Sequence, residues 1–296
     1  MKHILILTFL LFFTLLAGCI KENMDDCERT SLYFSYTGDL REQLFARKIS
    51  QVDLFVFDAQ DKILQTKTVI QNELNKYQGT RLNLAPGTYR IVCIGNAFNN
   101  TMVQCTGKKL QENYRIAHPN YFNGGEIQTN DSLYLGSAQI SVPSDYWSHD
   151  TLSFRSSHLK VYVEVRGVAT AEELTKATPG LRLQVRNCLP ATDFSNQPCG
   201  ERVTYIPAAT YDAEKRVLIS RFNILRHTPD CSITFDLSDP ADNLIFSLSL
   251  KDFLQQHPVI DLSQQEVLIP ILIEFKSTTV TVTMPDWSIE QIRPEL

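Results

Sequence analysis

The sequence lacks the features that mark a nucleic-acid-binding protein or a disordered chain. Its 296 residues contain 28 Lys and Arg against 33 Asp and Glu, no basic run is longer than two residues, and the net charge is −5. Such a balance offers no surface for neutralising phosphates. Charged residues make up 21% and hydrophobic residues 43%, so the chain has apolar material for folded cores and too little charge for an extended polymer. We predict a globular protein that binds no nucleic acid.

The sequence also lacks the motifs that carry common chemistry. It contains no glycine-rich phosphate loop, no G-x-G-x-x-G, no H-E-x-x-H and no G-x-S-x-G. The histidines after the N-terminal segment are scattered at positions 118, 149, 158, 227 and 257. The acidic segment 236–243 has oxygen atoms that could bind calcium but not the spacing of the known calcium loop, and a solvated turn is the preferred interpretation. We therefore predict no enzyme activity, no catalytic residue, no cofactor and no metal.

Only one long apolar run is present, from Ile4 to Ala17, and it is shorter than the roughly 20 residues that span a bilayer. It follows a short basic start and ends in Leu16-Ala17-Gly18-Cys19, which resembles the bacterial lipoprotein box, where the thiol is acylated and the chain is cut just before it. We predict a signal peptide over residues 1–18 and lipidation of Cys19, with an ordinary secretory signal as the alternative. Two or three acyl chains, palmitate among them, hold a protein firmly on a membrane.

Residues 19–27 are predicted to form a lipidated tether, because Ile20 to Asp26 are mostly polar and show no periodicity. The acidic residues in this stretch resemble a signal for display on the outer face of the outer membrane. A plain solvated spacer is the alternative. The expected location is therefore the outer membrane, on the cell surface.

Beyond the tether the pattern is one of short strands, many of them β-branched or aromatic and separated by turn signals. Strands are predicted at 31–36, 52–57, 80–84, 89–94, 132–137, 140–142, 151–154, 158–165, 181–186, 216–219, 232–237, 244–250, 267–275 and 278–284. Helices are predicted at 170–177 and between Asp39 and Lys48, and a long loop at 98–130. A turn-rich stretch at 143–150 is the predicted boundary between two all-β sandwich domains, 28–150 and 151–296.

Six cysteines remain besides Cys19, at positions 27, 93, 105, 188, 199 and 231. An even number in an exported chain permits disulfides. The favoured pair is Cys188 with Cys199, because turn residues lie between them. Cys27 could pair with Cys105, and Cys93 has the surroundings of a buried thiol. The cysteine spacing does not match a zinc site.

Several segments together resemble the fimbrillin-associated anchor family, the FimB-type lipoproteins at the base of type V pili. The resemblance runs nearly end to end and rests on the order of these segments: Leu16–Cys19, Asp25–Cys27, Val52–Asp58, Leu84–Tyr89, Val92–Asn96, Ser247–Phe253 and Val280–Trp287. It implies two tandem transthyretin-like antiparallel β-sandwiches, a lipid-anchored base for fimbriae that ends their assembly and supports adhesion, and no enzymatic activity.

The resemblance also implies assembly by strand complementation, in which an extended segment of one subunit completes a sheet of the next. Stalk subunits of such pili lose their first strand to proteolysis, whereas an anchor cut in the same way would lose its lipid. We therefore predict that the chain stays intact after Arg29, Arg41 and Arg47.

We predict that residues 278–296 offer the pairing surface to the first stalk subunit. The candidate contacts are Val280, Val282, Met284, Trp287 and Ile289. The alternative is that this segment is only the last strand of the second sandwich.

A second function class remains open, a surface lipoprotein that binds glycans. Tyr146, Trp147 and Trp287 are possible sugar platforms, although they form no cluster in the sequence. Isolating the lipoprotein from its own cells, with its bound subunits or glycans, would distinguish the two functions.

Overall fold

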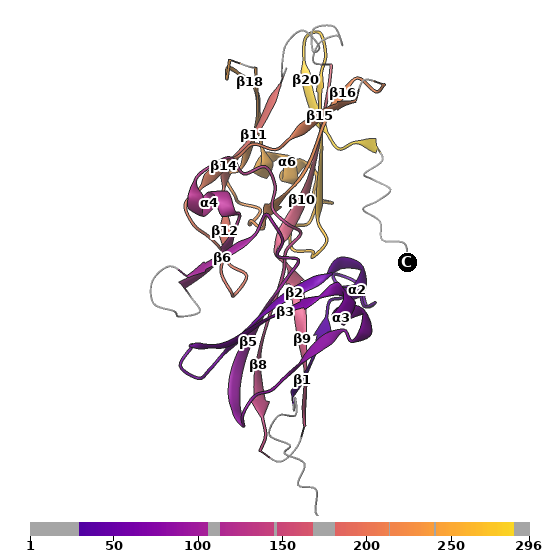
Figure 1. Ribbon diagram of the computed structural model, residues 1–296. Helices are drawn as coiled ribbons and strands as arrows, with labels where there is room; N and C mark the ends of the chain where they lie inside the picture. Colours follow the sequence, from indigo (N-terminus) through magenta and orange to yellow (C-terminus); the bar gives the residue numbers. More distant parts are fainter. Residues whose placement is uncertain are drawn as a thin grey trace, which may run out of the picture.

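The computed structural model describes residues 30–105, 113–144, 147–167, 181–212, 214–239 and 241–286. The predicted all-β class is confirmed: strands dominate, and they gather into an elongated molecule with one group of sheets at each end (Figure 1). No helix within these residues has the length and apolar character needed to cross a bilayer. The predicted signal peptide, the tether and the helix at 170–177 lie outside the described residues.

The N-terminal half forms a seven-stranded sheet in the order β3-β2-β5-β8-β9-β1-β4. Its strands are β1 (Thr30–Ser35), β2 (Gln51–Phe57), β3 (Ile63–Ile70), β4 (Gly79–Leu82), β5 (Gly87–Gly95), β8 (Tyr134–Val142) and β9 (Ser148–Ser156). Helix α2 (Phe45–Lys48) confirms the short helix predicted before Lys48, and α3 (Gln71–Lys76) follows β3. The sheet folds over on itself around a core to which β1, β2, β4, β5, β8 and β9 all contribute.

Strand β2 illustrates how the sequence builds this half. Val52, Leu54 and Val56 alternate along the strand and are fully buried in the sandwich core, as expected for side chains that point to one face. Phe55 and Phe57 point the other way and pack in a second cluster outside the sandwich. A strand that is apolar on both faces is expected to be covered on both, and the two clusters cover the two faces of β2. Its edges pair with β3 and β5.

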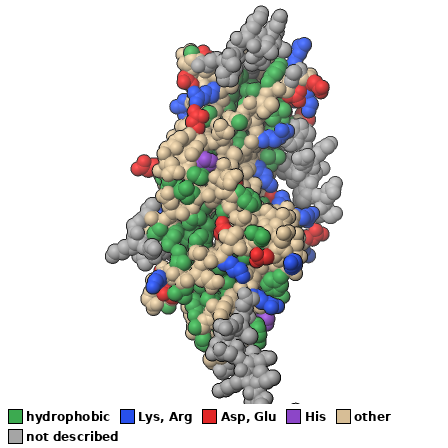
Figure 2. All heavy atoms as spheres, viewed as in Figure 1, with side chains coloured by type: hydrophobic (Ala, Val, Ile, Leu, Met, Phe, Trp, Pro, Cys, Tyr) green, Lys and Arg blue, Asp and Glu red, His purple; other side chains and the backbone are tan. Residues whose placement is uncertain are grey.

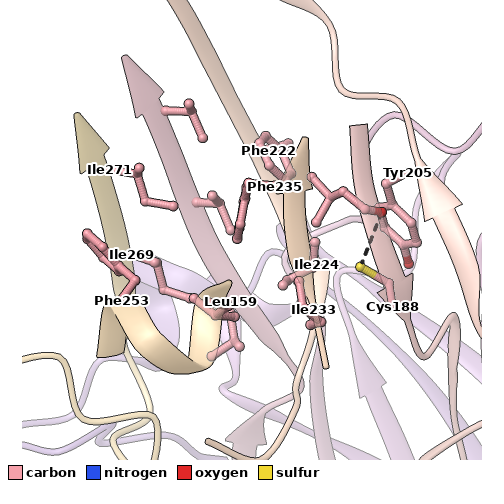
Figure 3. Close-up of a cluster of buried hydrophobic side chains, with 14 of the residues drawn as sticks. Leu159, Cys188, Tyr205, Phe222, Ile224, Ile233, Phe235, Phe253, Ile269 and Ile271 are labelled. Atoms are coloured by element: carbon pink, nitrogen blue, oxygen red, sulfur yellow. Dashed lines mark hydrogen bonds between the residues drawn. The ribbon is translucent and has the colours of Figure 1, made fainter. Parts of the chain in front are cut away.

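The C-terminal half is a sandwich of two facing sheets, ordered β15-β16-β10-β19-β20 and β14-β11-β17-β18. Its elements are β10 (His158–Arg166), β11 (Arg182–Cys188), β14 (Val203–Tyr205), β15 (Ala209–Asp212), β16 (Val217–Leu225), β17 (Thr234–Ser238), β18 (Leu244–Ser249), α6 (Leu250–Gln256), β19 (Leu268–Phe275) and β20 (Val280–Thr283). The core between the sheets is a single apolar cluster (Figure 3). Helix α6 covers one end of it with Leu250, Phe253 and Leu254.

A small third sheet has the order β13-β12-β7-β6. It consists of β6 (Met102–Cys105), β7 (Tyr114–Ala117), β12 (Ala191–Thr192) and β13 (Pro198–Cys199), and α4 (Pro119–Asn123) follows β7. The prediction of a long loop at 98–130 is therefore wrong in this region. Tyr114 and Phe194 of this layer stack at 4.8 Å and cover the outward-facing Phe57 of β2.

The predicted boundary after residue 150 falls within β9, which pairs with β8 and β1 of the N-terminal sheet. Only Ser157 separates β9 from β10, the first strand of the C-terminal sandwich. We propose that the division lies at Ser157. The small sheet joins the two halves, since β12 from the second half pairs with β7 from the first.

Candidate functional site

The first candidate feature is the position of β1 inside the N-terminal sheet. This strand pairs in parallel with β9 over six residues and antiparallel with β4 over four. Leu32 is fully buried and Phe34 is 2% exposed. The Phe34 ring lies 5.7 Å from the rings of both Phe45 and Phe154. The strand that connects the fold to the predicted tether thus lies inside its sheet, with a paired strand on each side.

Two of the three arginines expected to remain uncut follow β1 directly. Arg41 and Arg47 are exposed, and the nearest ion-pair partner of Arg47 is Glu42 at 3.8 Å. Arg29 lies outside the described residues. Cleavage after Arg41 or Arg47 would break the covalent link between β1 and the rest of the sheet, so that only strand pairing and packing would then hold β1.

The second candidate feature is β20, which contains part of the predicted pairing segment. It pairs with β19 through four residues and has no neighbouring strand on its other side among the described residues. Val280 is 39% exposed, whereas Val282 and Met284 are half-buried against the C-terminal core. The described part of the segment is therefore the last strand of its own sheet, with one edge open. Trp287 and Ile289 lie outside the described residues.

A third feature, the open edge formed by β18, is not apparent from the sequence pattern. This strand, Leu-Ile-Phe-Ser-Leu-Ser, is the last in its sheet and carries no charge. Leu244 is 60% and Ile245 46% exposed, and the Phe246 ring packs against Phe275 of the facing sheet at 6.2 Å. Natural sheets usually protect an edge with charges, proline or a covering element. An uncharged strand beginning with two aliphatic residues was the available signal.

The open edges of β18 and β20 lie at the same end of the molecule (Figure 1). In Figure 1, β18 and β20 are at the upper end, whereas β1 lies in the lower sandwich. On the face shown in Figure 2, acidic and basic side chains are interspersed. Backbone groups on an open strand edge, with apolar side chains beside them, are suited to receive another extended strand.

The favoured disulfide between Cys188 and Cys199 is not formed in the structure. Cys188 ends β11 in the C-terminal sandwich, whereas Cys199 lies opposite Ala191 in the small sheet, so the two strands diverge into different layers. Burial raises the pKa of the Cys188 thiol, and its Sγ contacts the Val185 carbonyl oxygen at 3.8 Å (Figure 3). Cys93 is a fully buried thiol. Cys27, the proposed partner of Cys105, lies outside the described residues.

The described histidines and carboxylates do not assemble a reactive centre. No group of three or more His, Cys, Asp or Glu side chains in the described ranges could hold a metal ion. Burial lowers the pKa of His158 and of His227 to about 4, so both are neutral at pH 7. In the acidic segment 236–243, for which a solvated turn was the preferred interpretation, Asp239 accepts hydrogen bonds from the Ala241 and Asn243 backbone amides, the geometry of a turn.

One of the three possible sugar-platform residues is described. Trp147 is 47% exposed, next to the start of β9. Tyr146 and Trp287 lie outside the described residues.

Residues 24–293 match the family described as fimbrillin-A associated anchor proteins Mfa1 and Mfa2. The chain belongs to this family. The match covers nearly the whole sequence and therefore includes both sandwiches and both candidate features. The fimbrillin-A associated anchor family is one of structural fimbrial proteins and not an enzyme class. No curated protein matches the sequence closely enough to serve as a relative.

Solved structures of low sequence identity share the fold. A Bacteroides ovatus protein described as an adhesin has a TM-score of 0.70 at 16% identity, covering 87% of this chain and 93% of its own. A Bacteroides thetaiotaomicron protein described as polysaccharide-binding has a TM-score of 0.68 at 12% identity, covering 88% and 99%. The fimbrial anchor protein Mfa2 from Porphyromonas gingivalis has a TM-score of 0.64 at 12% identity, covering 86% and 95%. Together with the family match, these structures support a fimbrial anchor or adhesin-like role at the cell surface.

Proposed function

We propose that this protein anchors fimbriae to the outer membrane as a lipoprotein acylated on Cys19 and limits their assembly at the base. The observation that carries the proposal is the position of β1, which is paired on both sides within its own sheet. A sheet already completed by its own strand has no vacancy for a strand from a neighbouring subunit at that position. Assembly would then proceed in one direction only, away from the membrane.

The partner would pair at the opposite end. In this proposal the first stalk subunit adds a strand along the open edge of β20 and the residues that follow it, with Val280, Val282, Met284, Trp287 and Ile289 as its contacts. Because β20 has only four paired residues and no fully buried side chain, detaching or extending it would cost little. The acyl chains on Cys19 would supply the membrane attachment.

Affinity isolation from the native cells tests this proposal. The tag is placed in the exposed turn at Gln60, between β2 and β3, so that both ends of the chain stay unmodified. We expect fimbrial subunits to copurify with the full chain from the membrane fraction. A variant lacking residues 286–296 should lose the subunits and stay in the membrane, whereas Cys19→Ala should keep the subunits and leave the membrane.

Three results would count against parts of the proposal. Wild-type retention of fimbriae by the truncated chain would remove the C-terminal pairing surface. Membrane retention of Cys19→Ala would remove the lipid anchor. Glycans in place of subunits would favour the polysaccharide-binding alternative, which one structural neighbour carries in its description.

A further inference from the structure

One carboxylate at the junction of the two sandwiches gathers side chains from four separate elements. Glu266, in the loop before β19, accepts hydrogen bonds at Oε1 from the hydroxyls of Tyr36 at 2.6 Å and Tyr134 at 3.0 Å. Its Oε2 contacts Nζ of Lys48 at 2.8 Å and Nζ of Lys160 at 2.9 Å. Tyr36, Tyr134 and Lys48 belong to the N-terminal sandwich. Glu266 therefore connects the loop before β19, in the C-terminal sandwich, to the N-terminal sandwich.

A second carboxylate makes the reverse connection. Asp39 follows β1, and its Oδ2 accepts hydrogen bonds from the backbone amides of Gln265 at 2.7 Å and Glu266 at 3.2 Å. The segment after β1 therefore both donates to and accepts from the segment before β19. Arg226 stiffens the same loop by donating to the carbonyls of Leu262 and Gln265 and, across the junction, to that of Ser156.

The contacts of Glu266 with the two tyrosines are shielded from water, whereas Asp39 is exposed and Lys48 and Lys160 are partly exposed. Shielding makes a charged hydrogen bond stronger than one on an open surface. Tyr36 and Tyr134 are each 1% exposed, and the Glu266 side chain is 21% exposed. Burial alone would raise the pKa of Glu266, but hydrogen bonds from Lys48, Tyr36 and Lys160 lower it to about 2. The carboxylate is therefore ionised at neutral pH.

These contacts complete a path along the length of the molecule. β1 lies parallel to β9, and β19 lies parallel to β10. Because only Ser157 separates β9 from β10, those two strands run through the junction as one nearly continuous extended segment. β1 and β19 lie beside this continuous pair, one in each sandwich, but no short covalent connection joins them. The carboxylates of Asp39 and Glu266 connect the end of β1 to the loop before β19. The chain enters the fold through β1 and continues beyond β20, the partner of β19.

We propose that Tyr36, Asp39 and Glu266, here called the junction latch, transmit tension from β1 to β19, so that β1 stays seated and both sandwiches bear load as one unit. The direction of the load rests on the proposed anchor function. The latch itself rests only on the contacts described above. Without it, a pull on the N-terminus would be resisted by the pairing of β1 alone, and β1 would leave the sheet first.

Pulling single molecules in an optical trap tests the proposal. The unlipidated mature chain, from Cys19 to Leu296, carries handles at its two ends. We expect the edge strand β20, which has only four paired residues, to detach first at low force, after which the rest of the wild-type chain ruptures in one step. Glu266→Gln, which keeps the shape but removes the charge, should rupture in two steps, with the first on the order of ten times faster at a fixed force. Tyr36→Phe, which removes one hydroxyl, should show the same change in weaker form.

A matched control separates load transmission from general stability. Asp236 is also a buried carboxylate, paired with Arg186 at 2.7 Å and with Ser247 at 2.6 Å, but it lies within the C-terminal sandwich. We expect Asp236→Asn to rupture in one step like the wild type. One-step rupture of Glu266→Gln and of Tyr36→Phe at the wild-type rate would overturn the latch, as would identical behaviour of Glu266→Gln and Asp236→Asn. Because no fimbrial subunit is present, this result is independent of the anchor function.

Discussion

The strand next to the predicted tether and two edge strands at the far end of the molecule are placed in opposite ways. The N-terminal sandwich places β1 between two neighbours and buries its side chains, whereas the C-terminal sandwich ends in β18 and β20, each with one open edge and exposed apolar side chains. Burial and pairing on both sides make a strand hard to remove, and an open apolar edge favours addition of another strand. The molecule thus combines an end at which β1 is enclosed, here called the closed end, with an end that offers open apolar edges, and this difference agrees with the anchor function proposed above.

The largest expected effect comes from removing a side chain at the closed end. Leu32→Ala deletes a fully buried side chain in the middle of β1 and should lower the free energy of unfolding by about 2–5 kcal/mol. Val280→Ala is the matched change on β20, where the side chain is 39% exposed, and should cost less than about 1 kcal/mol. Urea unfolding followed by fluorescence measures both. Equal losses in the two variants would contradict the contrast between the ends.

Acid should weaken the junction and the C-terminal sandwich through two buried histidines. The pKa of His158 and of His227 is lowered to about 4 by burial, whereas an unfolded histidine titrates near 6.5. Between these values the unfolded state binds more protons, so stability is complete above about pH 6.5 and falls as the pH drops toward 4. Each histidine should contribute a loss of roughly 2–3 kcal/mol over this range.

Urea midpoints at pH 7 and pH 4.5 measure this acid sensitivity. His227→Gln should reduce the difference between the two midpoints, because it removes one of the groups whose pKa burial lowers; His158 and His118 keep theirs. His257→Gln is the control, since His257 is half-buried and its ring contacts the Phe253 carbonyl oxygen within one helix. An unchanged pH dependence in His227→Gln would show that the acid sensitivity arises elsewhere.

A close backbone approach at the closed end offers a third test. A Cβ added at Gly79 in β4 would lie 2.2 Å from the carbonyl oxygen of Leu32 in β1. Backbone atoms cannot yield as a flexible side chain does, so Gly79→Ala should separate β4 from β1 and cost about 1–3 kcal/mol. Hydrogen exchange measured by mass spectrometry should show faster exchange in 30–35 and unchanged exchange in β18. Unchanged protection of β1 would mean that β4 contributes little to its retention.

The sequence pattern predicted most of the strands but not which strands pair with one another in the sheets. Val52, Leu54 and Val56 revealed β2 because alternating apolar residues have one structural meaning. β3 was missed because its pattern is mostly polar, as befits an edge strand with half-exposed side chains. β12 and β13 have two residues each, too few to produce a period.

The candidate site depended on long-range pairing, which local patterns do not encode. The pairing of β1 with β9 brings Thr30 to Ser148, 118 residues away, with their hydroxyls 3.0 Å apart. The Cys188–Cys199 prediction failed for the same reason: the turn after β12 returns the chain to Ala191, whereas Cys188 belongs to another sheet. The Glu266 cluster joins residues up to 230 positions apart, and no spacing in the sequence identifies it.

Two substitutions with the smallest expected effect on stability should identify, through their effect on partner capture, the edge that receives the partner. Val280→Lys and Ile245→Lys each place a charge on an exposed position of an open edge, so both should change the free energy of unfolding by no more than about 0.5 kcal/mol. A lysine on an edge nevertheless opposes addition of another strand, because the new strand would have to desolvate the ammonium group. We expect Val280→Lys to reduce capture of fimbrial subunits severalfold and Ile245→Lys to leave it unchanged. The reverse pattern would move the pairing surface from β20 to β18, and equal loss in both would mean that the partner spans the two edges together.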